Sequence, residues 1–194
     1  MDVSRKVIFD IGFNKCGTRT VNAMMKKAGY VAKHWRGGEL ALDVKYAYEN
    51  NDIPLKQFPK TDFFSDMVSE KPGSFFEAYK CFKFLAESYP NSLFIITERN
   101  VDAWIKSRIN HGNGHSVNCY KKQFGFSTLD EVEKFWREDW ESHRANVDAY
   151  FSNEERKHRL LKLNIETPDF KAISTFLDKK ITSDYWGHEG KTKK

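Results

Sequence analysis

The chain is 194 residues long, 40% apolar and 15% aromatic, which excludes a disordered protein and suits one globular core. Its net charge of +5 is mild and fits an anionic ligand or an acidic partner, although a solvated basic surface explains it equally well. No apolar run approaches the ~20 residues of a membrane span. No signal peptide begins the chain, and its widely spaced cysteines indicate reduced thiols, so we expect one cytoplasmic domain over residues 1–194.

Apolar residues follow strand and helix periodicities in alternation along the chain. In order, the patterns predict a strand at 7–11, helices at 21–28, 40–48 and 75–89, a strand at 93–97, helices at 101–108 and 129–150, a strand at 160–163, and a helix ending near residue 177. This alternation predicts an α/β fold with a mainly parallel sheet flanked by helices. The polar stretches 52–73 and 109–126 are expected to be long loops, of the kind that often act as lids.

Capping residues mark the ends of several predicted helices. Gly29 stands where a glycine commonly follows the last turn of the first helix. Thr128 and Glu131 have the spacing of a capping box before the long helix. Thr167 is expected to be the N-cap of the last helix, with Pro168 in its first turn.

The stretch DIGFNKCGTRT, residues 10–20, joins the first predicted strand to the first predicted helix. Gly12 and Gly17 bracket four residues, as in the nucleotide-triphosphate loop G-x-x-x-x-G-K-[ST]. Here the lysine is Lys15, inside the loop, and Thr18 follows the second glycine. A glycine turn between a strand and a helix places backbone N–H groups around an anion. A P-loop-like phosphate site is therefore predicted, although the glycines can also serve only to shape the turn.

A second candidate anion site follows the strand predicted at 93–97. Arg99 stands at the carboxyl end of that strand, the edge at which parallel sheets bind ligands. Ser107 lies about two turns into the next helix. A guanidinium and a hydroxyl placed in this way can bind a phosphate separate from the one at the first loop, whereas either residue alone is typical of a protein surface.

The two motifs together resemble those of the sulfotransferases that use 3′-phosphoadenosine 5′-phosphosulfate (PAPS). The loop of that family reads approximately K-x-G-T-[TS]-[ST], and this chain has Lys15, Cys16, Gly17, Thr18, Arg19 and Thr20 in its place. Arg19 departs from the pattern, because a small hydroxyl residue usually stands there. The family also has an arginine at a strand end followed by a serine, with the spacing of Arg99 and Ser107. The resemblance extends over about residues 5–190.

The resemblance implies an enzyme that moves the sulfuryl group of PAPS to a hydroxyl or amine of an acceptor. It implies that residues 15–20 bind the 5′-phosphosulfate, that Arg99 and Ser107 bind the 3′-phosphate, and that Lys15 stabilises the leaving group. PAPS and 3′,5′-ADP are then the nucleotide ligands, and no metal is expected, because PAPS has no β/γ-phosphate chain that needs Mg²⁺. Neither a membrane nor a nucleic acid is expected as a partner. The sequence names neither the acceptor nor the oligomeric state.

Three residues are candidates for the general base. Asp66 is the first choice: it follows a pair of phenylalanines, and partial burial there would raise its pKa toward neutrality. His34, after the first helix, and His111, one turn beyond Ser107, are the alternatives. Each candidate also has a structural interpretation, Asp66 as a turn or helix cap and the histidines as solvated loop residues.

Two other classes of function remain open. A nucleotide kinase or P-loop hydrolase also uses a glycine loop, but here the lysine is misplaced and no clear aspartate-ended strand for magnesium is seen. A protein that binds a nucleotide without catalysis is the other class. Binding of nucleic acid is not favoured, because the aromatic residues fall mostly at helical core spacing and form no evident stacking platform.

Overall fold

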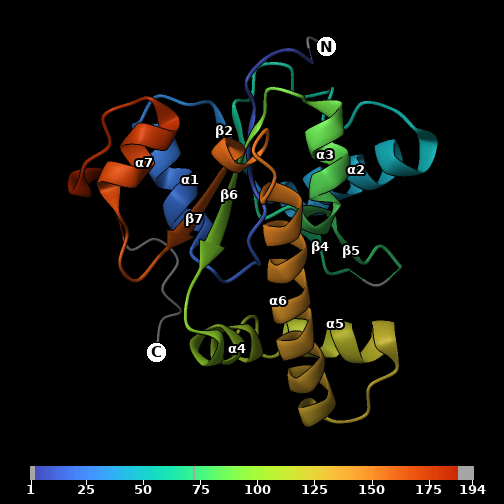
Figure 1. Cartoon of the computed structure of the whole chain (residues 1–194). Helices are drawn as coiled ribbons and strands as arrows, with labels where there is room; N and C mark the ends of the chain where they lie inside the picture. Colours follow the sequence, from blue (N-terminus) through green and yellow to red (C-terminus); the bar gives the residue numbers. More distant parts are fainter. Residues whose placement is uncertain (1–2, 72, 188–194) are drawn as a thin grey trace.

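Five strands form one sheet in the order β2–β3–β1–β6–β7, and every neighbouring pair is parallel (Figure 1). The strands are β1 Ile8–Asp10, β2 Ala32–His34, β3 Phe63–Ser65, β6 Leu93–Glu98 and β7 Leu160–Asn164. The structure is a computed structural model that describes residues 3–71 and 73–187. The predicted α/β fold, a parallel sheet flanked by helices, is confirmed.

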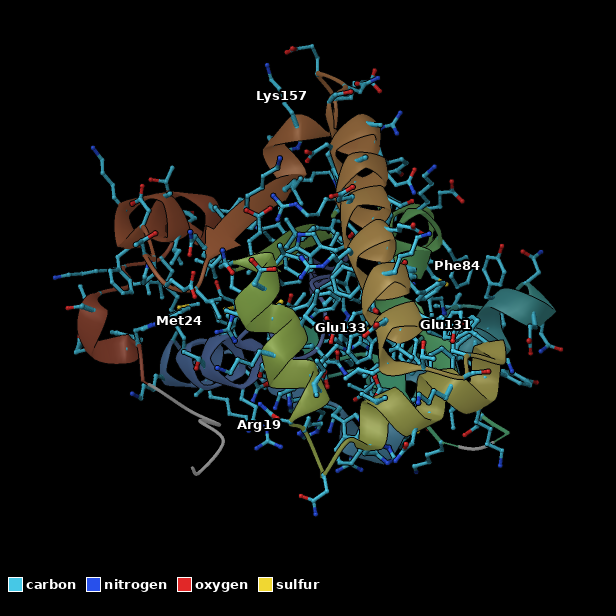
Figure 2. The ribbon with its side chains drawn as sticks, turned by 90° about the horizontal axis from the view of Figure 1, so that it is seen from below. Arg19, Met24, Phe84, Glu131, Glu133 and Lys157 are labelled. Carbon is cyan, nitrogen blue, oxygen red and sulfur yellow. The ribbon has the colours of Figure 1, made fainter. Side chains whose placement is uncertain are left out.

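Helices cover both faces of the sheet, because the side chains of each strand point alternately to opposite sides. One face is covered by α1 Thr18–Lys27 and α7 Phe170–Leu177, the other by α2 Glu39–Asn50, α3 Phe82–Ser88 and α6 Leu129–Phe151. In β1, Ile8 packs with Met24 of α1 on the first face, and Phe9 packs on the second. Figure 2 shows Met24 on the α7 side of the molecule. Burial on both faces explains why these strands are continuous apolar runs.

Two further helices and a hairpin lie beyond the carboxyl ends of the strands. Helix α4 Val101–Ile109 follows β6, and α5 His115–Phe124 follows α4 (Figure 1). Strands β4 Val68–Ser69 and β5 Phe76–Glu77 form the antiparallel hairpin. The short 3-10 turns are η1 Arg36–Gly38, η2 Ala78–Cys81, η3 Lys157–Arg159 and η4 Ser183–Tyr185. The edge that α4, α5 and the hairpin surround is the one at which parallel sheets bind ligands.

Most predicted elements are confirmed near their predicted bounds. The predicted strands correspond to β1, β6 and β7, and the predicted helices at 21–28, 40–48, 101–108 and 129–150 correspond to α1, α2, α4 and α6. Gly29 follows α1 with a φ of 86°, as a glycine in this position should. The Thr128 hydroxyl accepts from the Glu131 N–H at 3.2 Å, and the Glu131 carboxylate accepts from the Thr128 N–H at 2.8 Å. The capping box is therefore confirmed.

The two stretches predicted to be loops contain regular structure. The stretch 52–73 holds β3 and β4, and the stretch 109–126 holds α5. The sequence of α5, HSVNCYKKQF, is too polar to show its apolar period, and part of its buried face is a polar contact. Ser116 is buried and its hydroxyl donates to the Glu70 carboxylate at 2.6 Å. Strand β2 has no counterpart among the predicted strands, because three residues are too few to show a period.

The helix predicted at 75–89 is wrong in its first half. The chain instead forms β5 and η2, and α3 begins only at Phe82. The backbone is extended because Glu77 pairs with Val68 in the hairpin. The Glu77 carboxylate also accepts a hydrogen bond from the buried Tyr120 hydroxyl, which a helix in this place would not allow.

The start predicted for the last helix is also wrong. The helix begins at Phe170, and its N-cap is Asp169 rather than Thr167. The Asp169 carboxylate accepts from the N–H groups of Lys171 and Ala172 at 3.0 and 2.9 Å. An aspartate caps a helix at least as well as a threonine, which explains the shift.

Three further expectations concern a membrane span, the cysteines and the limits of the domain. Within residues 3–71 and 73–187, no helix combines the length and apolar character that crossing a membrane demands. The three cysteines carry free thiols. The predicted domain limits, residues 1 and 194, lie outside the described residues.

Candidate functional site

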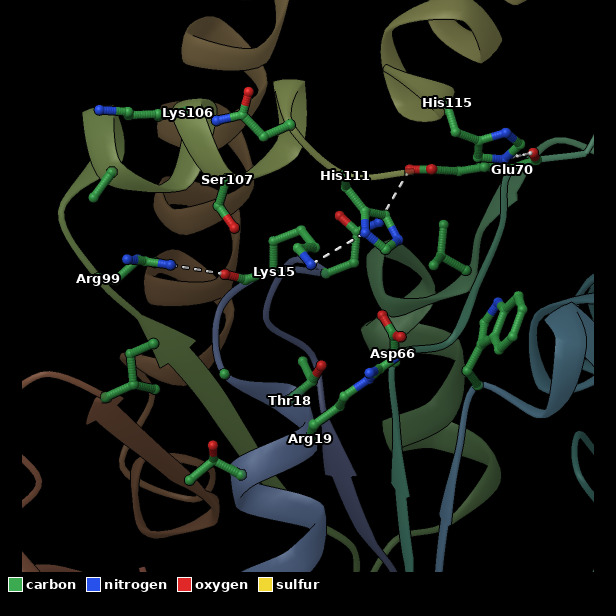
Figure 3. A pocket seen from close by; sticks show the side chains of 18 of the residues that line it. Lys15, Thr18, Arg19, Asp66, Glu70, Arg99, Lys106, Ser107, His111 and His115 are labelled. Atoms are coloured by element: carbon green, nitrogen blue, oxygen red, sulfur yellow. Dashed lines mark hydrogen bonds between the residues drawn. The ribbon is translucent and has the colours of Figure 1, made fainter. Parts of the chain in front are cut away.

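A cavity of about 1500 Å³ opens at the carboxyl edge of the sheet (Figure 3). Its walls come from the β1–α1 loop, the segments that follow β2, β3, β6 and β7, the helix α4 and the start of α5. Lys15, Asp66, Arg99, Ser107 and His111 all line it. The structure therefore brings both predicted nucleotide motifs together with two of the three candidates for the base.

The β1–α1 loop has the backbone of an anion-binding turn. Lys15 and Gly17 adopt left-handed φ angles of 67° and 72°, and α1 begins at the next residue, Thr18. Such a φ is uncommon for a residue other than glycine. Where left-handed and right-handed backbone conformations alternate, successive N–H groups point toward one place and can bind an anion there. Thr18 and Thr20 line the cavity in the first turn of α1, at the positive end of the helix dipole.

Both glycines of the loop are sterically required. A Cβ on Gly12 would lie 2.7 Å from the Thr97 backbone nitrogen, because the chain passes close to β6 there. A Cβ on Gly17 would lie 2.9 Å from the Ile165 side chain, in addition to the strain of a left-handed φ. The glycines therefore do shape the turn, and the turn that they shape lines the cavity.

Buried side chains hold the loop from beneath. The Trp104 indole N–H donates to the Asn14 carbonyl at 3.0 Å, and the Asn14 side-chain amide donates to Glu70 Oε1 at 3.0 Å. Glu70 also accepts from the fully buried Arg108 at 2.8 Å. Because these partners are themselves packed, the loop is held in one conformation before any ligand binds, which is the condition for electrostatic catalysis.

Asp10, the last residue of β1, is fully buried under the loop. Its Oδ1 accepts from the Gly12 N–H at 3.0 Å and from the Thr97 hydroxyl at 3.2 Å, while Oδ2 has no partner within the described residues. Burial raises the pKa of Asp10 from 3.8 to about 7. The native protein therefore keeps this proton at pH values at which the unfolded chain has lost it.

Asp10→Asn is expected to flatten the pH dependence of stability. Because the native carboxyl group has the higher pKa, its protonation favours the folded state at low pH, and this contribution is lost as the pH rises through about 7. The loss is at most about 1.4 kcal/mol per pH unit for one group. Asparagine keeps the Oδ1 acceptor and has no charge to bury. Urea unfolding of the wild-type protein and of Asp10→Asn at about pH 4 and about pH 7 measures the effect. An equal change in the free energy of unfolding between the two pH values in both proteins would contradict the prediction.

Lys15 extends its ammonium group into the cavity, where it meets His111 (Figure 3). Lys15 Nζ donates to His111 Nδ1 at 3.2 Å. Burial lowers the pKa of Lys15, and burial together with the charge of Lys15 lowers the pKa of His111. His111 is therefore a neutral imidazole that accepts a hydrogen bond from the cation of the loop.

Asp66 and His34, the other two candidates for the base, lie in contact. Strands β2 and β3 pair in a register that sets His34 beside Ser65. His34 Nε2 lies 3.3 Å from Asp66 Oδ2, and His34 Nδ1 lies 3.1 Å from the Ser65 hydroxyl. Asp66 also takes a left-handed φ of 54°, which is uncommon outside glycine. Two residues that the sequence presents as alternatives thus lie in contact with each other.

Burial sets the protonation of this pair. Burial, followed by the negative charge of Glu70, raises the pKa of Asp66 to about 7. Burial, followed by the positive charge of Arg19, lowers the pKa of His34 to about 4. A salt bridge would shift both pKa values in the opposite directions. Near neutral pH the pair is therefore a neutral imidazole in contact with a carboxyl group that is close to its pKa.

Arg99 and Ser107 face the cavity from the β6–α4 unit. Arg99 Nη1 donates to the Lys15 carbonyl at 3.3 Å, and Nη2 lies 3.8 Å from Glu166 Oε1. Arg99 Nε has no partner within the described residues. Figure 3 shows the Ser107 hydroxyl directed into the same part of the cavity. These long contacts leave the guanidinium with capacity to bind an anion.

The remaining residues of the predicted motif differ in placement. Gly17, Thr18 and Thr20 line the cavity. Cys16 is fully buried in the core, where burial raises the pKa of its thiol, and its side chain is not part of the cavity wall. Arg19 does line the cavity, but Figure 3 shows its side chain extended toward Asp66.

Three residues of the cavity wall are not predicted by any pattern in the sequence. Glu70 joins the β1–α1 loop to α4 and α5 through its carboxylate, and Trp35 and Trp186 contribute large aromatic surfaces. No spacing links them, since they reach the cavity from separate segments. Among the described residues, no group of three or more His, Cys, Asp or Glu side chains could hold a metal ion.

A known protein family matches the part of the chain that contains most of this site. A family model described as a sulfotransferase domain matches residues 6–126, more than half of the 194 residues. The matched stretch includes the β1–α1 loop, Asp66 and the β6–α4 unit with Arg99. No curated protein matches the chain. The resemblance predicted from the loop and from Arg99 with Ser107 is confirmed at the level of the family, and the chain belongs to the sulfotransferases.

Proposed function

We propose that this sulfotransferase takes its sulfuryl group from PAPS and passes it to a hydroxyl or amine of an acceptor. The observation that supports PAPS most is that two separate groups suited to bind anions line one cavity. One is the β1–α1 loop with the first turn of α1, and the other is Arg99 with Ser107. A nucleotide with phosphates on both its 3′ and 5′ oxygens can occupy both sites, whereas a 5′-nucleotide can occupy one.

In this proposal each anion site holds one end of the donor. The backbone N–H groups of the loop, Thr18 and Thr20 bind the 5′-phosphosulfate, because they stand at the N-terminus of a helix. Arg99 and Ser107 bind the 3′-phosphate. The lack of a partner for Arg99 Nε among the described residues supports this role, since a buried guanidinium normally has its donors engaged.

The transfer is a displacement at sulfur. The acceptor oxygen forms a bond to sulfur while the bond from sulfur to the 5′-phosphate oxygen breaks, and 3′,5′-ADP leaves with that electron pair. Lys15 stabilises the negative charge that develops on the leaving phosphate. The proton of the acceptor hydroxyl passes to the carboxylate of Asp66.

Asp66 suits the role of base better than either histidine. Its pKa of about 7 lets it take a proton near neutral pH, and it lines the cavity. His34, hydrogen-bonded to Ser65 at 3.1 Å and with Nε2 3.3 Å from Asp66 Oδ2, is a positioning residue that orients the carboxylate. His111 is engaged by the Lys15 ammonium at 3.2 Å. The kinase alternative loses its basis, because the family of the chain transfers sulfuryl groups.

3′,5′-ADP is expected to raise the unfolding temperature far more than 5′-AMP does, because 3′,5′-ADP alone reaches Arg99 and Ser107. A hydrogen bond to a charged group contributes about 1.5–3 kcal/mol, so the two affinities should differ on the order of 10- to 100-fold. Thermal-shift measurements at equal ligand concentration test this, with ATP and Mg²⁺ as a third sample for the kinase alternative. In Arg99→Gln, 3′,5′-ADP is expected to raise the unfolding temperature no more than 5′-AMP does.

Arg137→Gln is the matched control for this experiment. Arg137 pairs with Asp102 at 2.7 Å on the outer side of α4 and does not line the cavity. The control should keep the preference for 3′,5′-ADP. Equal shifts for the two nucleotides in the wild-type protein would remove the support for PAPS as the donor.

A further inference from the structure

Arg19 occupies the loop position at which a small hydroxyl residue is usual, and its side chain does not follow the loop. It is the second residue of α1, is exposed, and lines the cavity. Figure 2, which views the molecule from the carboxyl edge of the sheet, shows Arg19 at the near end of α1. Figure 3 shows its guanidinium extended toward Asp66, the side of the proposed base. The departure in sequence therefore places a cation on the acceptor side of the cavity.

This cation is not neutralised by a contact in the part of the chain that the structure describes. No hydrogen bond or ion pair there engages the Arg19 side chain. The carboxylate toward which it points, that of Asp66, has its Oδ2 3.3 Å from His34 Nε2 instead. A guanidinium at a cavity wall has paired donors in a fixed geometry that suits a carboxylate or a sulfate.

Trp35 stands on the same side, directly after His34 at the end of β2. Trp35 is 45% exposed and lines the cavity. Its φ is +53°, an unfavourable value for a bulky residue, which persists because two hydrogen bonds fix the turn. The Trp35 N–H donates to the Ser65 carbonyl at 3.0 Å, and the Trp35 carbonyl accepts from the Gly38 N–H at 3.1 Å. These bonds fix the backbone from which the indole extends, and an indole at a cavity wall can present a flat apolar face to a ring.

We infer that the acceptor is a ring compound that carries an anionic group in addition to the hydroxyl that it presents to Asp66. In this arrangement Trp35 covers the face of the ring and Arg19 binds the anion. The inference rests on the proposed function, because the role of Asp66 identifies this side of the cavity as the acceptor side. Acidic sugars and phenols that bear a carboxylate share this chemistry.

Equilibrium binding to the complex with 3′,5′-ADP tests the inference. Turnover is a poor first readout, because the charge of Arg19 lowers the pKa of Asp66 and its removal would alter the base for every acceptor. The probes are two pairs whose members differ in charge. One pair is 4-nitrophenyl β-D-glucuronide and 4-nitrophenyl β-D-glucoside, and the other is 4-hydroxyphenylacetate and its amide.

The wild-type complex is expected to bind the anionic member of one pair more tightly than the neutral member, on the order of 10- to 100-fold. The pair that shows this preference distinguishes a sugar from a phenol. Arg19→Gln should remove the preference, and Arg19→Lys should restore part of it. Trp35→Ala should weaken the binding of both members of the pair by the same factor. Lys26→Gln, which removes an exposed cation from α1 outside the cavity wall, should keep the preference.

Two results overturn the inference alone. One is equal affinity of the wild-type complex for the two members of both pairs, including no binding of any probe. The other is a preference that survives Arg19→Gln. Failure of the wild-type protein to bind 3′,5′-ADP, which is measured first in the same titration, would overturn the proposed function and the inference with it.

Discussion

Asp66→Asn is expected to lower the turnover of PAPS by about 10²–10⁴-fold, the usual cost of losing a general base. Asparagine keeps the size of the side chain and an oxygen for His34, but it cannot take the proton of the acceptor. The affinity for 3′,5′-ADP should stay unchanged, because Asp66 belongs to neither anion site. The measurement is the release of 3′,5′-ADP from PAPS with the phenol or sugar probe that the wild-type protein turns over fastest.

The pH dependence of kcat/KM tests the same role of Asp66. Asp66 accepts a proton only when it is ionised, so kcat/KM of the wild-type enzyme should rise with pH through about 7 and then level off. His34→Gln should move that midpoint at a smaller cost in rate, since the histidine acts through the carboxylate. His111→Gln should leave the midpoint in place. Near-native turnover in Asp66→Asn would overturn the assignment, and the histidine variant that then proved inactive would identify the base.

Lys15→Met is expected to lower turnover by about 10²–10³-fold, as the loss of one preorganised group at a developing charge does. The affinity for 3′,5′-ADP should fall much less, because the charge on the leaving oxygen is largest in the transition state. Methionine keeps the apolar stem of the side chain. It also adds no backbone strain relative to lysine, since both are non-glycine residues at a φ of 67°. Turnover and nucleotide binding are measured on the same preparation.

Lys26→Met is the control for Lys15→Met. Lys26 belongs to the same strand–loop–helix unit but is exposed and lies outside the cavity wall, so its loss should leave the affinity unchanged and should alter turnover far less than the loss of Lys15 does. A Lys15→Met enzyme with weaker nucleotide binding and a normal kcat would show that Lys15 stabilises the bound donor rather than the transition state.

That the loop and Arg99 with Ser107 line one cavity could be predicted because the determinants of their placement are local. The loop residues 15–20 are consecutive, and Arg99 and Ser107 share one strand–helix unit. Within such units, spacing along the chain fixes spacing in the structure. The same reasoning explains why β1, β6 and α1 lie where their apolar patterns predict.

The acceptor side depends on contacts between distant segments, which no local pattern reveals. His34 meets Asp66 because β2 and β3 pair in a register that sets His34 beside Ser65. Both strands have only three residues, too few for a period of two to be recognised. The sequence therefore offers the histidine and the aspartate as alternatives, and only the pairing of the strands shows that they lie in contact.

Helix α5 and the hairpin, which the sequence misassigns, share a physical cause, which is the burial of charged and polar side chains. Arg108 is fully buried and donates at 2.8 Å both to Glu70 and to the Tyr120 hydroxyl. Glu77 accepts from the same tyrosine. These contacts hold α5 and the hairpin in place, whereas a pattern-based prediction assigns polar residues to the surface. An element stabilised by a buried polar network has no apolar period to detect.

The five tryptophans fall into two groups that differ in their surroundings. Trp104, Trp136 and Trp140 are packed together in the core, with the ring centroids of Trp104 and Trp140 4.7 Å apart, whereas Trp35 and Trp186 line the cavity. Indole emission shifts to longer wavelength as the ring meets water, so the core group gives a steady, blue-shifted background. The two cavity tryptophans respond when a ligand excludes water from them. With either one replaced by phenylalanine, the other becomes an intrinsic optical reporter, and filling of the cavity can be followed in real time without a label.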